Sequence, residues 1–250
     1  ILQIFGSNPD TMAEAVKIVN EKYKPDGIDI NMGCPVPKIT GKNKAGSALM
    51  KDPERAVEII KKIKQINPKL TLSVKTRLGW NSEDEILDFA PKLEQAGINL
   101  ITIHGRTKKQ GYSGKANWEM ITKVKKKLSI PVIANGDIIS SDDIEKCLKT
   151  TKADGIMIGR GVLGRPWALS SRFEVLGLKT KDKTNIILKH AKFHLEHYGE
   201  NGMVTFRKHL AWYFKSKNFP EIKDVKKLRV ELMKVKSFDE LKNILSDHEV

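Results

Sequence analysis

Cys34 lies in a loop whose residue types suit acid–base or nucleophilic chemistry. It follows a strand-like run at residues 27–31, in the sequence Asn-Met-Gly-Cys-Pro. A thiol in such a loop can donate a proton or attack an electrophile. Gly33 and Pro35 indicate a turn rather than a packed face, so we expect a functional thiol, with an inert one as the alternative. Cys147, on the apolar side of a predicted helix, is expected to be inert.

Charged side chains close two further strand-like runs. Lys75 ends the run Leu-Ser-Val-Lys, and Arg77 lies two residues later, so both side chains can point the same way. A cation at a strand end can stabilise an electron-rich cofactor or an anionic intermediate. His104 ends another run, and Arg106 follows it closely. We predict that these residues bind a ligand, while a surface lysine and a hydrogen-bonded histidine are the plain alternatives.

Two glycine-containing turns predict a phosphate site. The first is Asn135-Gly136-Asp137 and the second is Gly159-Arg160-Gly161 with Gly164, and each ends a strand-like run. In a barrel of parallel strands, the loops after the last two strands often bind phosphate through backbone N–H groups. Arg160 can add a charge-assisted hydrogen bond.

The elements that must position these residues alternate regularly. Strand-like runs at 1–5, 27–31, 70–76, 100–104, 131–135 and 155–159 alternate with helical patterns at 10–22, 52–66, 82–95, 118–128 and 141–149. Asp52 before Pro53 is a plausible N-cap, and Ser82 and Glu85 are spaced as a capping box. Such repeats predict a parallel α/β sheet, either closed or doubly wound. The candidate residues all sit at the carboxyl ends of strands, which converge in a closed barrel, so we favour a (β/α)8 TIM barrel. The chain opens in a strand without an initiator Met, and we expect the first two strands to be missing.

After residue 183 the pattern is helical only, with predicted helices at 185–198, 204–217, 225–235 and 238–245. We therefore predict a partial barrel domain at 1–178 and a helical domain at 184–250, joined by the polar segment 179–184. In the helical part, Arg207-Lys208-His209 precedes an aromatic run at 211–215. Basic residues interleaved with aromatics suit RNA, although the pattern alone favours a helix with an aromatic core face and a solvated basic face.

Composition sets outer limits on function. Forty-five Lys and Arg against thirty Asp and Glu give a net charge of +15, which fits a polyanionic partner such as nucleic acid or, alternatively, a lysine-rich proteome. No run approaches the roughly 20 apolar residues of a membrane span. Two cysteines cannot form a disulfide framework, so we expect a cytoplasmic protein with no membrane partner.

Taken together, these motifs resemble the signature segments of the tRNA-dihydrouridine synthases. The resemblance rests on residues 31–35 with Lys38, the small residues at 45–48, and the motifs at 75–77, 104–107, 135–137, 157–161 and 207–209, in matching order through essentially the whole chain. It implies an FMN-binding barrel followed by a helical domain that docks tRNA. It also implies that FMN, reduced by NADPH, reduces the 5,6 double bond of particular uridines. The Pro-Met-Ala flavin-binding segment of the family's first strand is absent.

The resemblance also implies roles by position. Cys34 matches the proton donor to carbon 5 of uracil. Gln3, Lys75 and His104 match positions that contact the flavin ring system. The positions that bind the ribityl and phosphate groups are matched by Asn135, Gly136, Asp137, Gly159 and Arg160. Positions near the substrate RNA are matched by Asn31, Arg77, Arg106, Arg207, Lys208 and His209. No metal is expected, and we expect a monomer when the protein is full length.

Two other functions remain open at this point. One is an FMN-dependent oxidoreductase of the dihydroorotate dehydrogenase type acting on a small molecule, which has no use for the helical domain. The other is a non-catalytic RNA-binding protein on the same fold, against which Cys34 and Lys75 speak.

Overall fold

Alternation along the strands gives the sheet of this protein one apolar face and one polar face. The computed structural model describes residues 1–169, 179–199, 201–216 and 218–248. The chain forms two compact units, Ile1–Ile158 and Gly159–Val250, and each is described by itself. The second compact unit thus begins at residue 159. The predicted barrel domain ends later, at residue 178, which lies outside the described residues. The predicted domain bounds stay a prediction.

The first unit is built on a parallel sheet whose strand order equals the chain order. The strands are β1 (Leu2–Ile4), β2 (Ile28–Met32), β3 (Leu72–Arg77), β4 (Leu100–His104), β5 (Val132–Asn135) and β6 (Gly155–Met157). Each strand pairs in parallel with the next. A doubly wound sheet reverses its strand order at a switch point, and these six strands do not. The predicted class, α/β with consecutive strands of a TIM barrel, is confirmed.

A helix follows each of the first five strands, and capping residues mark where some of these helices begin. They are α1 (Pro9–Tyr23), α2 (Pro37–Thr40), α3 (Pro53–Ile66), α4 (Ile86–Ala96), α5 (Trp118–Lys127) and α6 (Ser141–Thr151). Asp52 accepts a hydrogen bond from the backbone N–H of Arg55 and so starts α3, with Pro53 in the first turn. The predicted capping box of Ser82 and Glu85 is present, but it opens a 3₁₀ turn at Glu83–Glu85 before α4.

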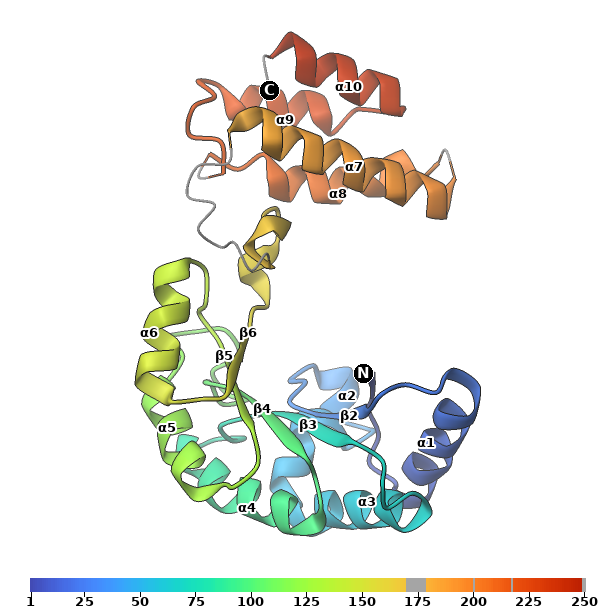
Figure 1. Cartoon of the computed structure of the whole chain (residues 1–250), viewed down its shortest axis with the longest axis vertical. Coiled ribbons are helices and arrows are strands. Elements are labelled where there is room, and N and C mark those ends of the chain that lie inside the picture. Colours follow the sequence, from blue (N-terminus) through green and yellow to red (C-terminus); the bar gives the residue numbers. More distant parts are fainter. Residues whose placement is uncertain (170–178, 200, 217, 249–250) are drawn as a thin grey trace. The chain divides into compact units, whose positions relative to one another are not determined.

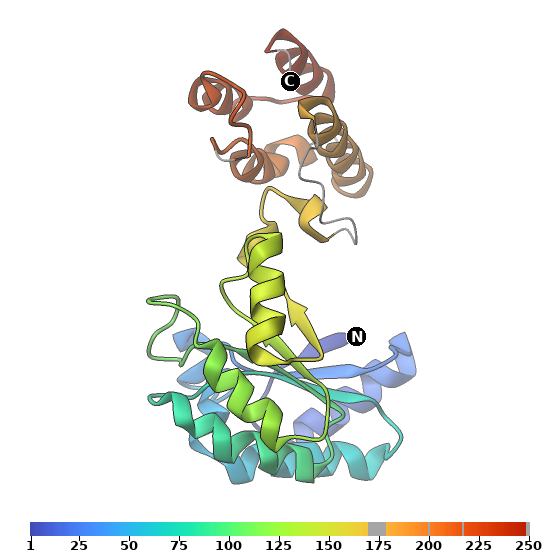
Figure 2. The ribbon, with the colours of Figure 1, turned by 60° about the vertical axis from the view of Figure 1, so that its left-hand side comes forward.

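The core of this unit lies between the helices and one face of the sheet. Figures 1 and 2 show α1 and α3–α6 along that face. On β2, the side chains of Ile28, Ile30 and Met32 are fully buried, and β3, β4 and β5 contribute their apolar residues in the same alternation. Cys147 of α6 is also fully buried there, in agreement with its predicted inert role. The opposite face, called the inner face below, is therefore left for polar side chains.

The second unit is helical. Two 3₁₀ turns, Arg160–Val162 and Pro166–Leu169, precede α7 (Thr180–Tyr198), α8 (Gly202–Tyr213), α9 (Val225–Leu232) and α10 (Phe238–Asp247). Its own core gathers apolar and aromatic side chains from these four helices. The prediction of a linker at 179–184 is wrong, because α7 begins at Thr180 and the Thr184 hydroxyl donates to the Thr180 carbonyl inside its first turns. The predicted helix 204–217 ends earlier, at Tyr213, and Lys217 lies outside the described residues.

Among the described residues, no helix combines the length and the apolar character needed to cross a membrane.

Candidate functional site

Strand register brings the predicted site residues into rows on the inner face. Gln3 pairs with Asp29, and Asn31 pairs with Lys75 in the next row. In the row nearest the carboxyl ends, Arg77 pairs with His104, and His104 with Asn135. Side chains two residues apart on a strand share a face, so these polar groups all face away from the helices. The predicted convergence of these strand ends is confirmed within the first unit.

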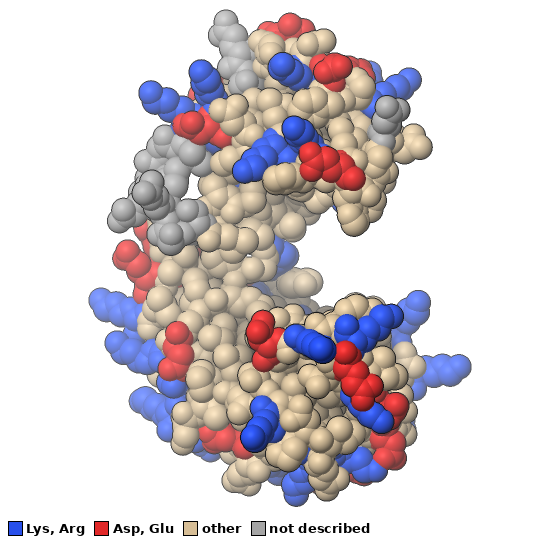
Figure 3. All heavy atoms as spheres, turned by 45° about the vertical axis from the view of Figure 1, so that its right-hand side comes forward, with Lys and Arg blue, Asp and Glu red and all other residues tan. Residues whose placement is uncertain are grey.

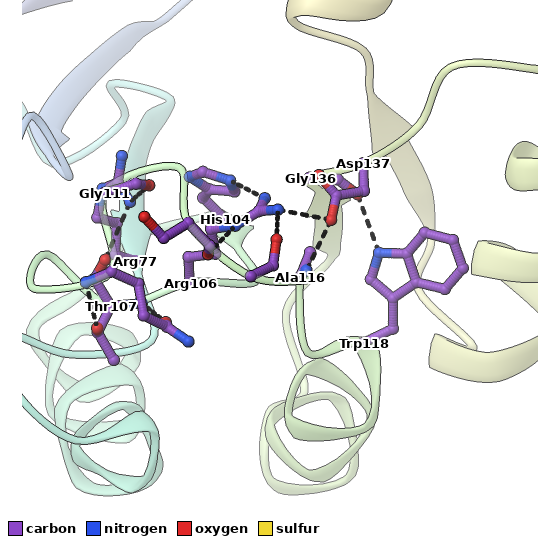
Figure 4. Close-up of polar contacts among 12 residues, drawn as sticks. Arg77, His104, Arg106, Thr107, Gly111, Ala116, Trp118, Gly136 and Asp137 are labelled. Carbon is purple, nitrogen blue, oxygen red and sulfur yellow. Dashed lines mark hydrogen bonds and ion pairs between the residues drawn. The ribbon is translucent and has the colours of Figure 1, made fainter.

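Arg106 forms the centre of a hydrogen-bond network at the end of β4 (Figure 4). Its guanidinium donates to the Asp137 carboxylate at 2.7 Å, to the Gly114 carbonyl at 2.6 Å and to the Ser113 carbonyl at 3.1 Å. Asp137 also accepts from the backbone N–H of Ala116 at 2.7 Å. Arg106 is only 2% exposed. The network fixes the loop that follows β4 onto the turn that follows β5.

Arg77 has a comparable structural setting. It donates to the Gly33 carbonyl at 2.8 Å, to the Thr107 carbonyl at 3.1 Å and to the Gly111 carbonyl at 2.9 Å. Its side chain is buried, and its guanidinium lies over the ring of Tyr112 at 5.9 Å. Arg77 thus connects the Cys34 loop with the loop after β4. Sequence reasoning could not foresee this, because the path of residues 107–114 decides which carbonyls it meets.

The inner face carries an excess of positive charge. Burial, reinforced by Arg77, Lys75 and Arg106, lowers the pKa of His104 to about 3, so its imidazole is neutral at physiological pH. Burial and then the charge of Arg77 lower the pKa of Lys75. Lys75 donates to the Asn135 amide oxygen at 3.3 Å. A neutral imidazole beside three cations suits a ligand that is electron-rich or anionic.

The His104 ring is oriented by its neighbours. Nε2 lies 3.4 Å from Nη1 of Arg106, and a guanidinium can only donate, so Nε2 acts as the acceptor. The ring proton then belongs on Nδ1. Gly136 packs against the same ring with φ of +118°, and a Cβ there would lie 2.8 Å from Cδ2 of His104. Only glycine satisfies both the backbone conformation and this close approach.

The Cys34 loop is fixed from both sides. The Asn31 amide oxygen accepts from the backbone N–H groups of Gly33 at 3.1 Å and Cys34 at 2.9 Å. Both the hydroxyl and the backbone N–H of Ser47 donate to the Cys34 carbonyl at 3.0 Å. Gly46, with φ of +61°, passes so close that a Cβ would lie 2.8 Å from that carbonyl. The half-buried thiol of Cys34 therefore sits on a defined backbone at the carboxyl end of β2.

Asp29 is a site residue that sequence reasoning missed. It lies on β2 between Ile28 and Ile30, shares the inner face with Asn31, and is 8% exposed. Its carboxylate accepts from the Gln3 amide at 2.7 Å and from the Ser73 hydroxyl at 2.6 Å. The sequence did contain a signal for this residue, because Asp29 is a charged residue that alternates with the apolar residues of a buried strand.

The two predicted phosphate turns belong to different units. Gly136 and Asp137 lie in the first unit, and the Asp137 carboxylate is engaged by Arg106. Gly159 and Arg160 open the second unit and are exposed. Gly164, interpreted from the sequence as part of the second turn, meets a different need: with φ of +74°, a Cβ there would lie 2.1 Å from the Trp212 carbonyl oxygen. That glycine is required by packing against the end of α8.

The basic motif of α8 divides into residues with different surroundings. Arg207 donates to the carbonyls of Val235 at 2.8 Å and Lys234 at 3.1 Å, which ties α8 to the segment after α9. His209 packs among rings, its centroid 4.7 Å from that of His190, and burial lowers its pKa to about 4. Lys208 is exposed.

Two histidines of α7 pack within the helical unit. His190 bonds the Tyr213 hydroxyl at 2.9 Å, and His194 bonds the Thr205 hydroxyl at 2.8 Å. In the part of the chain that the structure describes, no group of His, Cys, Asp and Glu could hold a metal ion.

The exposed basic side chains form no continuous patch on the face of the first unit that Figure 3 shows. On the face in Figure 3, the blue Lys and Arg side chains of the first unit alternate with red Asp and Glu. The charge of +15 therefore supplies a general attraction for a polyanion rather than a single stripe on this face.

Comparison with known proteins identifies the family of this chain. The family model described as dihydrouridine synthase matches residues 1–249. The chain belongs to the dihydrouridine synthase family. It is 42% identical to the probable tRNA-dihydrouridine synthase 1 of Synechocystis, covering 98% of this chain and 69% of that protein. It is 43% identical to tRNA-dihydrouridine synthase B of Pasteurella multocida, covering 85% of this chain and 66% of that protein.

The chain thus spans about two thirds of the length of these relatives. Among solved structures, a complex of 2-naphthoyl-CoA reductase is 17% identical with a TM-score of 0.48, covering 64% of this chain and 28% of that one. Family membership confirms the resemblance found in the motifs and makes this an enzyme of the flavin-dependent oxidoreductase type.

Proposed function

We propose that this protein reduces the 5,6 double bond of particular uridines in tRNA, with FMN as its flavin and NADPH as the reductant. Family membership and the relatives that are tRNA-dihydrouridine synthases support the reaction and the substrate class. The observation that carries the proposal in this chain is the position of Cys34. Its loop is held at the carboxyl end of β2, directly beside the polar inner face.

The residues of the inner face fit a flavin. Gln3, Lys75 and His104 offer hydrogen-bonding groups on neighbouring strands, and the cation excess suits a ring system that becomes electron-rich on reduction. When bound, FMN supplies the hydride for carbon 6 of uracil. We assign the ribityl and phosphate contacts to Asn135, Gly136, Asp137, Gly159 and Arg160.

Cys34 then supplies the proton that the uracil ring takes up at carbon 5. The two N–H bonds to Asn31 and the Ser47 bonds to its carbonyl fix the backbone from which the thiol projects. A positioned proton donor accelerates such a step by roughly 10²–10⁴. Asn31 has a second role in this proposal as a contact to the uridine.

Substrate binding involves residues of both units. We assign contacts with the RNA to Lys208, to Arg207 and His209 beside it, and to Arg77 and Arg106 near the uridine. For the two buried arginines, the contacts to loop carbonyls support a positioning role through the loops they hold. The uridine must leave its stacked neighbours to reach a site on the inner face of a barrel. A helical domain that holds the rest of the tRNA serves that need.

The experiment that tests the function uses full-length protein and unmodified tRNA. Dihydrouridine is mapped by mass spectrometry after incubation with NADPH or NADH, and the flavin released on denaturation is identified by chromatography. We expect FMN and NADPH-driven dihydrouridine at defined positions. Normal dihydrouridine in tRNA from cells lacking the gene, together with inactive purified protein, would overturn the proposal.

A further inference from the structure

A continuous chain of hydrogen bonds leads from the floor of the inner face to the Cys34 loop. It begins at the Ser73 hydroxyl, which donates to one oxygen of Asp29 at 2.6 Å. The Gln3 amide donates to the other oxygen at 2.7 Å, and the Asn31 amide donates to the Gln3 oxygen at 3.0 Å. The Asn31 oxygen then accepts the backbone N–H groups of Gly33 and Cys34.

We propose that Asp29 is a positioning residue that sets the orientation of the Gln3 and Asn31 amides and thereby holds the Cys34 loop. An ionised carboxylate only accepts hydrogen bonds, whereas each amide has a donating end and an accepting end. Gln3 must turn its NH2 toward Asp29, so its oxygen faces Asn31. Asn31 must then turn its NH2 toward Gln3, and only its oxygen is left for the loop.

The opposite orientation has a clear cost. An Asn31 turned the other way would aim its NH2 at the N–H groups of Gly33 and Cys34, which would lose their acceptor. Asp29 and Ser73 are 8% and 4% exposed, so water cannot readily replace a lost partner at this end of the chain of hydrogen bonds, where an unpaired polar group is costly. Asn31, Gly33 and Cys34 are half-buried, and Gln3 is exposed. Asp29 therefore specifies one orientation for the whole chain of hydrogen bonds.

The same orientation determines what the inner face offers to a ligand. Each amide uses one of its two N–H groups within the chain of hydrogen bonds, so the second can meet an acceptor of a ligand. Asp29 thus presents two amide donors in neighbouring rows, that of Gln3 in its own row and that of Asn31 in the row of Lys75. For catalysis this consequence rests on the proposed function, since it concerns how uracil and flavin meet the thiol.

The test exchanges the carboxylate and the amide between positions 29 and 3. In Asp29→Asn, the new amide can turn either way, so the orientation is no longer fixed. In Gln3→Glu, two carboxylates face each other, and their repulsion moves the side chain at position 3 away from Asp29 and out of line with Asn31. In the double variant, the amide introduced at position 29 donates to the carboxylate introduced at position 3, and that carboxylate accepts from Asn31. The original orientation then returns with the charge moved to the neighbouring strand. Asp26→Asn, at an exposed position just before β2, is the matched control.

The measurement is hydrogen exchange of the Gly33 and Cys34 amides in full-length protein without tRNA. We expect exchange to be about tenfold faster in each single variant, unchanged in Asp26→Asn, and within about threefold of the parent in the double variant. Unchanged exchange in the single variants would overturn the proposal. So would additive losses in the double variant, because they would leave Asp29 a merely structural residue.

A second readout separates this inference from the function itself. In Asp29→Asn, turnover of tRNA should fall about as much as exchange rises, while KM for tRNA stays within about twofold. If the exchange pattern holds but the parent protein makes no dihydrouridine, the function fails and the positioning role stands. If the parent is active and Asp29→Asn keeps full turnover despite a loosened loop, the role in catalysis is overturned.

Discussion

At the scale of single residues, the site assigns different tasks to groups that look alike in the sequence. Lys75, Arg77 and Arg106 all follow apolar runs, yet the two arginines donate to loop carbonyls, while Lys75 faces the Asn135 amide. The two cysteines differ in the same way. Cys34 lies half-buried on a fixed loop, and burial in the core raises the pKa of the Cys147 thiol to about 11.

Replacing Cys34 by Ala should separate hydride transfer to the flavin from proton transfer to uracil. We expect FMN binding and NADPH oxidation to remain nearly unchanged, because neither step uses the thiol. Dihydrouridine formation should fall by roughly 10²–10⁴. Single-turnover reduction of tRNA by prereduced protein measures this step. Cys147→Ala is the control, and a Cys34→Ala protein with normal turnover would assign the proton to another group.

His104 should make the stability of the first unit depend on pH. Its pKa is lowered to about 3 in the folded protein, whereas an unfolded histidine titrates near 6.5. As pH falls below about 6.5, the unfolded chain takes up a proton that the folded chain does not. This contribution to stability, complete above that pH, declines by up to about 1.4 kcal/mol per pH unit until pH approaches about 3.

Urea unfolding between about pH 8 and about pH 4.5 measures this effect. The difference in the free energy of unfolding between the parent and His104→Gln should shift in favour of the variant as pH falls, and it should be constant above about pH 7. Carboxylates titrate in both proteins, so the difference isolates His104. A pH-independent difference would mean that His104 takes up its proton in the folded state as well.

At the scale of elements, periodicity and caps predicted every strand of the first unit and the start of α3. A pattern of short apolar runs that alternate with amphipathic helical segments is compatible with few arrangements other than a parallel α/β sheet. The start of α7 was not predictable in the same way. The polar residues at 179–184 look like a connection, but they lie on the exposed turns of α7, whose buried side begins only at Thr184.

The sequence predicts those site residues that lie at the ends of strands. Residues that close a strand, such as Lys75 and His104, are recognisable because they follow an apolar run. Asp29 lies within a strand, and its partner Ser73 lies on another strand, so their contact depends on register. The loop after β4 is similar, because its path decides that Arg106 meets Asp137. Long-range pairing of this kind is carried by the folded structure rather than by local pattern.

Gly136→Ala tests the turn after β5. With φ of +118° and a Cβ position 2.8 Å from the His104 ring and 2.9 Å from the Ala116 side chain, the substitution combines backbone strain with a steric clash. We expect a loss of roughly 2–5 kcal/mol in the free energy of unfolding, together with weaker flavin retention as His104 is displaced.

Gly111→Ala is the matched control for that variant. Its φ is +58°, and nothing lies within 4 Å of its Cβ position, so only backbone strain of about 1–2 kcal/mol is expected. Chemical denaturation of both variants compares the two costs. Equal losses would show that the contact with His104 does not restrict position 136.

At the scale of the whole molecule, the two units have separate cores and are expected to serve one substrate. The helical unit offers a direct comparison in Lys208 and Arg207. Lys208→Ala should weaken tRNA binding without loss of stability. The slope of the logarithm of the tRNA association constant against the logarithm of the salt concentration should become shallower by about one unit, which corresponds to one lost phosphate contact. Arg207→Ala should lower the melting temperature of that unit, because its contacts to Val235 and Lys234 are lost.

Filter binding at several salt concentrations and thermal unfolding of each variant provide the measurements. If Arg207→Ala keeps its melting temperature and changes only the salt dependence, Arg207 contacts RNA more than it supports α8.

The sheet itself predicts how the 250-residue chain behaves alone. In the described residues, β1 and β6 are the two edges of a parallel sheet, and Phe5, beside β1, is 54% exposed. Unpaired edges invite pairing with another chain. We expect this chain by itself to associate with increasing concentration in sedimentation velocity, and the full-length protein to remain monomeric.

A charge placed at the edge should oppose that association, since natural edge strands are often protected by lysine. Phe5→Lys is therefore expected to shift the chain toward monomer. Ile18→Lys, at a site on α1 that is 51% exposed and away from the edge, adds the same charge and should leave the association unchanged. Equal effects of the two variants would attribute solubility to net charge. A parent chain that stays monomeric and melts cooperatively would contradict this prediction. It would mean that β1 and β6 are too short and too twisted to pair with another chain.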